Sequence, residues 1–415
     1  MLVHRTNVQG GEGSSVKVTA IRPPRLRTTE TEAERKVTWT ELFYDLVFVV
    51  AVSGLGARLL DDPTIRGAAA FTGLFVPLWW AWAGFTFYAD RYDTDDLGQR
   101  ILAVAQMVTI ALMAASISGD ETQSLIGFAL AYVGARLILI VMYLRARRHV
   151  PETRQLVGGY VRGMSIAVAF WLVSIFIPEP FRYFLWAIGL LIDGYTPYRL
   201  RRIQAKVPLD VAHLPERFGL FTILVLGESI AATVAGLGHE GWNAGPVVTA
   251  VLAVVVAAGL WWVYFDNLDG TVVRRRANQK TAWKPTTWIY GHLPLAIGLM
   301  ATAIGLEGAV IGAGGHDWPA NERWLLVAGV GGALIGIGII EVATERRDNA
   351  VSRLKAQWRV VGGVIAAVIG LLGGLTGPLV TMALLALLCA AQVGGDVWLN
   401  QREAANAGGV DIQDG

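Results

Sequence analysis

The sequence predicts an all-α integral membrane protein with about twelve transmembrane helices, and two observations carry this prediction. Apolar residues make up 54% of the 415-residue chain and charged residues only 16%, against roughly 25% charged residues in a soluble protein. The apolar residues also gather in long runs between charged loops, as in helices that cross a bilayer. This excludes the soluble globular, fibrous and disordered classes. A net charge of +2 gives no sign of a nucleic-acid partner, and the expected partner is the lipid bilayer.

Each predicted helix covers an apolar run that is bounded by charged residues. At 1.5 Å per residue, every run is long enough to cross about 30 Å of hydrocarbon, and the longer ones would be tilted. The run 250–262 is apolar on all sides and lacks the polar stripe of a soluble helix. The twelve predicted spans are 39–60, 68–89, 98–118, 122–144, 158–177, 181–198, 213–238, 245–266, 285–311, 321–341, 356–374 and 376–398.

The basic residues predict the side of the membrane that each loop faces, because Lys and Arg near span ends are retained in the cytoplasm. With the N-terminus placed inside, the two tails and the alternate loops hold 29 of the 35 Lys and Arg residues. The opposite side holds only Arg58, Arg66, Arg182 and Arg323. Both termini are therefore predicted to be cytoplasmic.

Four segments are expected along the chain. Residues 1–37 are polar and contain no apolar run before Trp39, so we expect a disordered cytoplasmic tail and not a cleaved signal peptide. Residues 38–205 and 206–400 each contain six predicted spans. Residues 401–415 are expected to form a cytoplasmic C-terminal tail.

The two six-span units resemble each other and predict a tandem repeat. Glu41 and Glu216 each begin a Glu-x-Phe sequence just inside the first span of a unit, and Leu-Trp-Trp occurs at 78–80 and again at 260–262. Because six is an even number, both units would enter the membrane with the same polarity, as in the parallel repeats of some secondary transporters. The alternative is that the Trp pairs are interfacial aromatic belts that recur by chance.

Several short motifs stand out in the sequence. They are Glu-Leu-Phe-Tyr-Asp-Leu-Val-Phe at 41–48, the Trp-rich stretch 79–82 leading into the acidic sequence 90–96, Glu-Arg-Phe-Gly-Leu at 216–220 and Gly-Glu-Ser at 227–229. These motifs resemble those of the bacterial low temperature requirement protein A family, and the helix that begins at Tyr290 is similar to a later signature of this family. The resemblance covers about residues 38–400 and implies a multi-span protein of the bacterial cell membrane, in a family without an established biochemical activity.

Ionisable side chains inside the predicted spans are the candidate site residues. Each costs a few kcal/mol or more in the bilayer, so each needs a partner or a purpose. Counted at 1.5 Å per residue, most of them lie roughly 5–15 Å below the cytoplasmic surface. The candidates for substrate or ion binding are Glu41, Asp45, Arg136, Asp193, Glu216, Arg217, Glu228 and His292.

Asp45 is expected to pair with Arg136 or Arg217, because an unpaired buried charge costs several kcal/mol. Glu41 lies four residues earlier on the same helix face, where its alternative role is to cap the helix N-terminus. The side chains of Glu216 and Arg217 point about 100° apart around the helix, so different partners are expected for them.

Glu228 lies twelve residues after Glu216, about 18 Å deeper and close to the bilayer centre. Its neighbours Gly227 and Ser229 are small enough to permit close helix contact or local unwinding. A carboxyl group at this depth predicts a proton-exchanging or cation-binding site. The alternative is a protonated carboxyl that donates one hydrogen bond to a backbone carbonyl.

The remaining buried candidates have two interpretations each. A glycine and a proline follow Asp193, and they either free backbone groups for ion binding or simply mark the helix end. His292 is either a proton relay or, as is more common for a lone membrane histidine, a hydrogen-bonded structural group. Glu307, Glu341 and Asp396 lie nearer the helix ends and are expected to reach water.

The expected function is a proton- or cation-coupled secondary transporter of unknown solute. The acidic candidates outnumber the two arginines, so a site among them should favour protons, metal cations or cationic solutes. The alternative is an intramembrane enzyme or lipid-handling protein that adapts the membrane to cold, with Glu41, Asp45, Glu216 and His292 as acid and base groups. A P-loop, zinc-ligand spacing and the HExxH and GxSxG motifs are absent from the sequence. No cofactor, metal site or catalytic residue is therefore expected.

Overall fold

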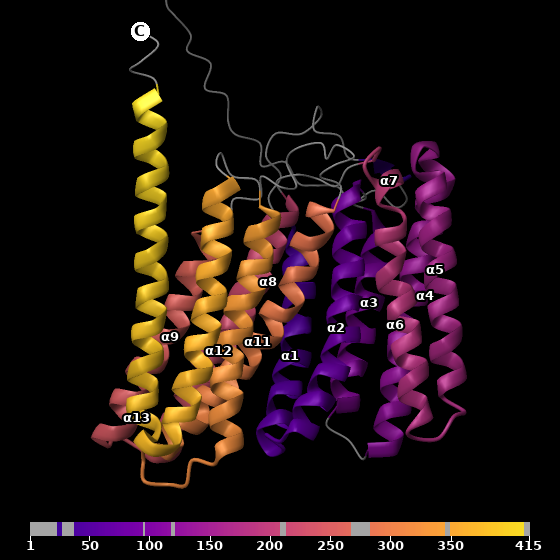
Figure 1. The fold of residues 1–415 in the computed structure, drawn as a ribbon. Coiled ribbons are helices and arrows are strands. Elements are labelled where there is room, and N and C mark those ends of the chain that lie inside the picture. The colour runs from indigo at the N-terminus through magenta and orange to yellow at the C-terminus, as the bar shows by residue number, and fades with distance from the viewer. Residues whose placement is uncertain are drawn as a thin grey trace, which may run out of the picture.

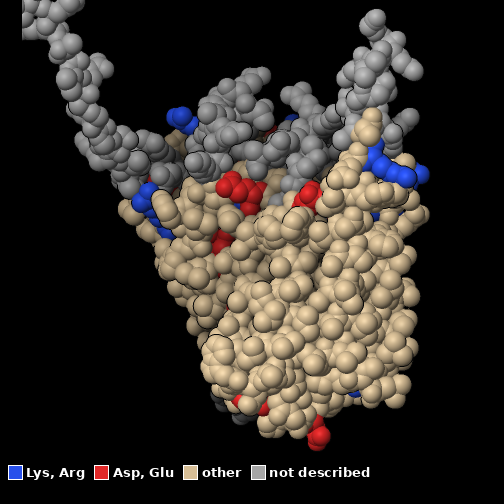
Figure 2. All heavy atoms as spheres, turned by 90° about the vertical axis from the view of Figure 1, so that its left-hand side faces the viewer, with Lys and Arg blue, Asp and Glu red and all other residues tan. Residues whose placement is uncertain are grey.

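The computed structural model describes residues 23–26, 37–93, 96–117, 121–207, 213–266, 283–344 and 349–410. Long helices stand side by side in one bundle (Figure 1). Within the described residues, ten helices are long and apolar enough to cross a membrane. On the face shown in Figure 2, most charged side chains lie near the two ends and a broad uncharged band lies between them. The chain is therefore a multi-pass, all-α membrane protein.

The helices of the first half begin and end within a few residues of the predicted spans. The α6 helix is not among the ten helices counted above. Two short elements, η1 (Pro151–Thr153) and α7 (Arg201–Gln204), lie between the long helices. The long helices are α1 (Trp39–Asp61), α2 (Ile65–Arg91), α3 (Leu97–Ile117), α4 (Glu121–His149), α5 (Arg154–Ser174) and α6 (Phe181–Arg199).

The second half contains α8 (His213–Glu240), α9 (Ala244–Phe265), α11 (Lys284–Gly312), α12 (Ala320–Ala343) and α13 (Asn349–Val410). The 62-residue α13 contains the last two predicted spans. Its helical geometry breaks at Gly377, with φ 78° and ψ 179°, just before Pro378, and only glycine adopts this conformation readily. The chain reverses there, so α13 consists of two antiparallel arms (Figure 1). The count of twelve crossings stays a prediction.

The N-terminal segment differs from the predicted disordered tail where it is described. β1 (Arg25–Leu26) pairs antiparallel with β2 (Tyr92–Asp93), which directly follows α2. Pro24 is buried, and Leu26 packs against the hydrophobic core. Apolar burial and backbone pairing thus fix this part of the tail, whereas residues 1–22 and 27–36 lie outside the described residues.

Helices that follow one another in sequence pack in a similar order within each half, although α9 also packs on α13, a contact with no counterpart between α2 and α5 or α6. In the first half, α1 packs on α2 and α3, α3 on α4, α4 on α5, and α5 on α6. In the second half, α8 packs on α9 and α11, α11 on α12, and α12 on α13. The halves meet where α1 and α2 lie against α8 and α11.

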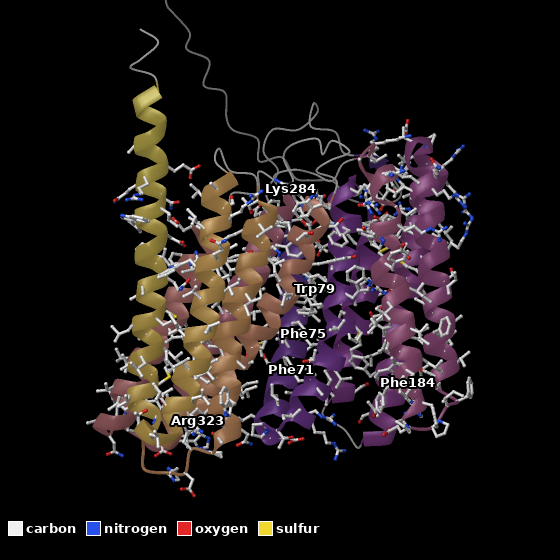
Figure 3. All side chains as sticks on the ribbon, in the orientation of Figure 1. Phe71, Phe75, Trp79, Phe184, Lys284 and Arg323 are labelled. Carbon is white, nitrogen blue, oxygen red and sulfur yellow. The ribbon has the colours of Figure 1, made fainter. Side chains whose placement is uncertain are left out.

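Glycines allow very close packing of α11 on α12. A Cβ atom added to Gly298 would lie 2.4 Å from the backbone N of Ala333, and one added to Gly329 would lie 2.4 Å from the backbone N of Thr302. Small residues at such contacts let helix backbones approach in the absence of a hydrophobic driving force between helices. Lys284 and Arg323, near the starts of these two helices, lie at opposite ends of the bundle (Figure 3).

Candidate functional site

Charged side chains from both halves of the chain meet in one buried network at the contact of α1, α2 and α8. We call it the interface network. Each of its residues is at most 3% exposed. The members are Glu41, Asp45, Asp90, His213 and Arg217.

The Asp45 carboxylate is the acceptor at the centre of this network. Arg217 Nη2 donates to Asp45 Oδ1 at 2.7 Å, and Trp82 Nε1 donates to the same oxygen at 2.8 Å. Arg217 Nη2 also lies 3.4 Å from Thr86 Oγ1. Asp45 Oδ2 is buried and has no hydrogen-bond partner among the described residues. The predicted pairing of Asp45 is thus confirmed, with Arg217 as the partner and not Arg136.

Glu41 both caps α1 and contacts the second half. Its carboxylate accepts hydrogen bonds from the Thr38 backbone N and Oγ1, both at 2.8 Å, while Thr38 Oγ1 accepts from the Glu41 backbone N at 3.3 Å. This reciprocal capping box fixes the start of α1. Glu41 Oε1 also lies 3.7 Å from Arg217 Nη1. The capping role and the pairing role therefore occur together.

His213 bridges two carboxyl groups of the first half, and the sequence analysis did not identify this contact. Its Nε2 lies 3.4 Å from Glu41 Oε2, and its Nδ1 lies 3.2 Å from Asp90 Oδ1. Both His213 and Asp90 lie at predicted span ends, where contact with water is the usual expectation. The sequence did contain one indication of this contact. His213 precedes Arg217 by four residues, so both side chains lie on the same face of the helix.

Arg136 and Asp193 form a separate buried pair between α4 and α6. Arg136 Nε lies 2.9 Å from Asp193 Oδ2. The Tyr132 hydroxyl accepts from Arg136 Nε at 3.0 Å and donates to Asp193 Oδ2 at 3.1 Å. The buried Tyr44 interacts electrostatically with Asp45, Arg217 and Arg136. Tyr44 thus lies within range of both this pair and the interface network.

Glu228 lies apart from both groups and is half-buried. Ser53 Oγ on α1 donates to Glu228 Oε1 on α8 at 2.7 Å. A Cβ atom added to Gly227 or Gly54 would meet nothing within 4 Å. The small size of Gly227 permits close helix contact or local unwinding, but neither occurs at this residue, because α8 is continuous here and the space beside Gly227 is open.

Two predicted site residues do not join the others. The Glu216 side chain is exposed, in accord with its expected divergence from Arg217. His292 is buried, with Nδ1 2.8 Å from the Trp288 carbonyl and Nε2 3.0 Å from the Tyr264 hydroxyl. These contacts favour the structural interpretation of His292, since both ring nitrogens already have partners.

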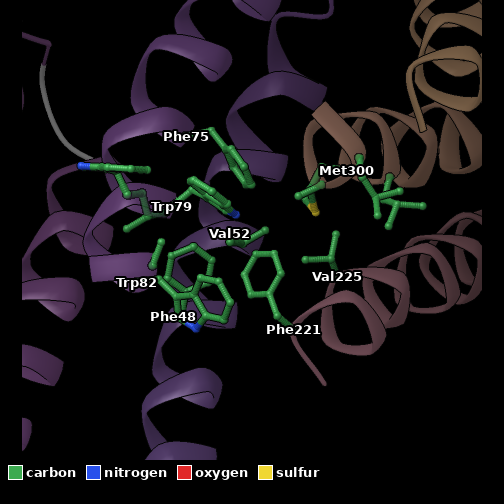
Figure 4. Packing of buried hydrophobic residues seen from close by; sticks show 14 of the residues in the cluster. Phe48, Val52, Phe75, Trp79, Trp82, Phe221, Val225 and Met300 are labelled. Atoms are coloured by element: carbon green, nitrogen blue, oxygen red, sulfur yellow. The ribbon is translucent and has the colours of Figure 1, made fainter. Parts of the chain in front are cut away.

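Phe48, Trp82 and Phe221 form an aromatic layer within the hydrophobic core (Figure 4). The ring centroid of Phe221 lies 5.3 Å from that of Phe48 and 4.3 Å from that of Trp82. Along α1, Phe48 lies between the network and Ser53, and along α8, Phe221 lies between the network and Glu228. The two polar sites are therefore divided by tightly packed rings.

A further buried ionic cluster joins α12 to α13, and we call it the α12–α13 cluster. The expectation that Glu341 and Asp396 reach water is wrong, because each is only 1% exposed. Asp396 lies well inside the second arm of α13, which continues to Val410, and Glu341 faces Arg359 of the first arm. Glu307, by contrast, is half-buried. The cluster comprises Glu341, Lys355, Arg359, Gln392 and Asp396.

Over the parts of the chain that the structure describes, no group of three or more His, Cys, Asp or Glu side chains has an arrangement suited to a metal ion. The carboxyl groups of the interface network instead contact a guanidinium, an imidazole and an indole.

Comparison with known proteins gives two matches. The family model described as bacterial low temperature requirement A protein matches residues 36–393, a range that includes the interface network, the Arg136–Asp193 pair and Glu228. A protein of Rhizobium meliloti (strain 1021), described as uncharacterized, is 29% identical over 327 residues, covering 75% of this chain and 77% of its own length.

Proposed function

The chain belongs to the bacterial low temperature requirement A family, and we propose that it is a proton- or cation-coupled secondary transporter of the inner (plasma) membrane. The observation that carries this proposal is the contact of ionisable groups from both halves of the chain. The interface network joins α1 and α2 to α8, and the bond between Ser53 and Glu228 joins α1 to α8 at a second level.

The proposed transporter has twelve crossings, arranged as two parallel six-helix repeats with both termini in the cytoplasm. The similar order of helix contacts in the two halves supports the repeat. Ten described helices are long and apolar enough to cross a membrane, with α13 counted once. In this proposal the 19-residue α6 and the second arm of α13 add the other two crossings. A parallel repeat of this kind is an arrangement in which two halves can rock against each other around a central site.

In this proposal the interface network closes the cytoplasmic end. Separation of the halves there would break the hydrogen bond from Arg217 to Asp45 and would expose a carboxylate whose Oδ2 has no partner among the described residues. The network contains three carboxyl groups, one guanidinium and one imidazole. This excess of acid supports a cationic rather than an anionic solute.

Glu228 is the proposed coupling residue. It has one hydrogen-bond donor, Ser53, and it is half-buried beside the open space at Gly54 and Gly227. An ionised carboxyl group in the bilayer interior is costly, so binding of a proton or a small cation would relieve that cost. Loading and release at Glu228 would thereby be linked to the contact between α1 and α8.

The enzyme alternative has less support from the geometry. It requires Glu41, Asp45, Glu216 and His292 to act on one substrate. Glu216 is exposed, whereas both His292 nitrogens are engaged by Tyr264 and Trp288. No observation therefore favours this function over transport.

Uptake by proteoliposomes tests the proposal. Purified protein is reconstituted with a pH-sensitive dye inside, and sodium, rubidium and methylammonium ions are supplied under an imposed pH gradient. We expect one of these cations to move protons across the membrane, and Glu228→Gln to reduce that flux at least about tenfold, as loss of an interaction worth about 1.4 kcal/mol would. Glu152→Gln, an exposed carboxyl in η1, is the matched control. Proton flux with no cation, or equal gradient-dependent flux in Glu228→Gln, would contradict the mechanism.

A further inference from the structure

The α12–α13 cluster contains two carboxyl groups that share one guanidinium nitrogen. Arg359 Nη2 donates to Glu341 Oε1 at 3.0 Å and also to Asp396 Oδ2. Both acceptors therefore lie within hydrogen-bond distance of a single atom. Two carboxyl groups held this close repel each other when both are ionised, and one of them then tends to hold a proton.

The remaining hydrogen bonds of the cluster do not reach the second carboxyl oxygen of Glu341. Arg359 Nη1 donates to Gln392 Oε1 at 2.7 Å, and Gln392 Nε2 donates to the Trp358 carbonyl at 3.2 Å. Glu341 Oε2 is buried and has no hydrogen-bond partner within the described residues. An ionised carboxylate pays the desolvation cost of such an oxygen in full, whereas a proton on Oε2 removes the charge that water would have solvated.

The cationic side chains of the cluster lie close to Asp396. Arg359 Nη2 is nearer to Asp396 Oδ2 than to Glu341 Oε1, and the fully buried Lys355 has its Nζ 4.0 Å from Asp396 Oδ1. On the other side, α11 presents Gly291 to this turn of α12, where it packs on Ile340. Of the two carboxyl groups, Glu341 is therefore the one that can hold a proton with the smaller loss of ionic contact.

We propose that Glu341 and Asp396 form a proton-binding carboxyl pair, in which Glu341 Oε2 carries one exchangeable proton. This site is distinct from the interface network and from Glu228, since its side chains come only from α12 and the two arms of α13. It does not depend on the proposed transport, because the proton can bind whether or not the protein moves a solute. Protons are the ligand that this donor set suits, since two cationic side chains already occupy it.

Infrared spectroscopy of the full-length protein in lipid nanodiscs tests this site without a transport assay. Difference spectra between alkaline and acidic pH report the carbonyl band of a protonated carboxylic acid, which moves on exchange into heavy water. We expect Glu341→Gln to remove one such band that is present in the unaltered protein. Glu152→Gln is the control, because its carboxyl is exposed and lies at η1.

A second variant keeps the test informative. Asp396→Asn removes the neighbouring negative charge, so the band of Glu341 should disappear at a pH at which the unaltered protein still shows it. If Glu341→Gln does not fold, Glu341→Asp should move the band in frequency without abolishing it. A band that persists unchanged in Glu341→Gln, or that is lost only in Asp396→Asn, would overturn the assignment of the proton to Glu341.

Discussion

Ser53 donates a 2.7 Å hydrogen bond to Glu228, and the two residues are 175 positions apart. The same separation relates Glu41 to Glu216, the residues that begin the Glu-x-Phe sequences of the two halves. In the proposed repeat, Ser53 and Glu228 would therefore be equivalent positions of the two halves. Contact between equivalent positions of a parallel repeat occurs at the pseudo-two-fold axis, so Glu228 would lie at the boundary between the two proposed moving bodies.

Ser53→Ala should reduce gradient-driven uptake. The serine hydroxyl donates the hydrogen bond that Glu228 accepts from α1, and a hydrogen bond to a charged acceptor is worth about 1.5–3 kcal/mol. Its loss removes this contact between α1 and α8, so initial uptake by proteoliposomes should fall about tenfold or more, as loss of about 1.4 kcal/mol would. Ser116→Ala is the control, since within the described residues that hydroxyl donates to the Leu112 carbonyl of its own helix. Unchanged uptake in Ser53→Ala would count against Glu228 as the coupling residue.

Arg217→Met should destabilise the protein strongly, because it leaves the Asp45 carboxylate buried without its cation. Removal of one partner of a buried pair costs about 3–5 kcal/mol. Asp45→Asn should cost a similar amount, and the double variant should lose clearly less stability than the sum of the two. Thermal unfolding in detergent measures all three variants. Strictly additive losses would show that the two side chains do not interact.

Gly298→Ala should weaken the packing of α11 on α12. The added Cβ atom would lie 2.4 Å from the Ala333 backbone N, so the two backbones must move apart. Overpacking of this kind costs about 1–3 kcal/mol. In Gly73→Ala the new methyl group meets nothing within 4 Å, and stability in the same unfolding assay should be unchanged or slightly higher. Equal stability of the two variants would refute the close contact.

Single cysteines should report the side of the membrane that each end of the bundle faces. The native Cys389 is the single cysteine of the chain, so Cys389→Ala supplies a cysteine-free background. In that background, His316→Cys should react with a membrane-impermeant maleimide in intact cells, because this side chain is 65% exposed in the loop before α12. Gln401→Cys, exposed near the end of α13, should react only after lysis. Labelling of Gln401→Cys from outside would reverse the predicted topology.

Helix positions were predictable from the sequence because they depend on local apolar runs. The pairing of Asp45 could also be narrowed to two arginines, since an unpaired buried charge is so costly. The choice of Arg217 depends on α1 lying against α8, which no local pattern records. Arg136 instead meets Asp193 because both face the interior of the first half.

Depth along a helix did not predict which side chains share a site. Glu216 and His292 lie near the depth of Asp45, but Glu216 points outward and His292 is enclosed by Tyr264 and Trp288. Conversely, His213 and Asp90 lie at helix ends and are fully enclosed by neighbouring helices. Burial at a helix end depends on tertiary packing, which the span boundaries alone do not record.

The rings of Phe48, Trp82 and Phe221 have a bioenergetic consequence. A continuous file of ionisable groups from one face of the membrane to the other would short-circuit the proton-motive force on which the cell depends. In the proposed transporter the rings would interrupt that file, because a packed apolar constriction excludes the water that would conduct protons. A cell could then keep many copies of such a transporter in an energised membrane without a leak current through them.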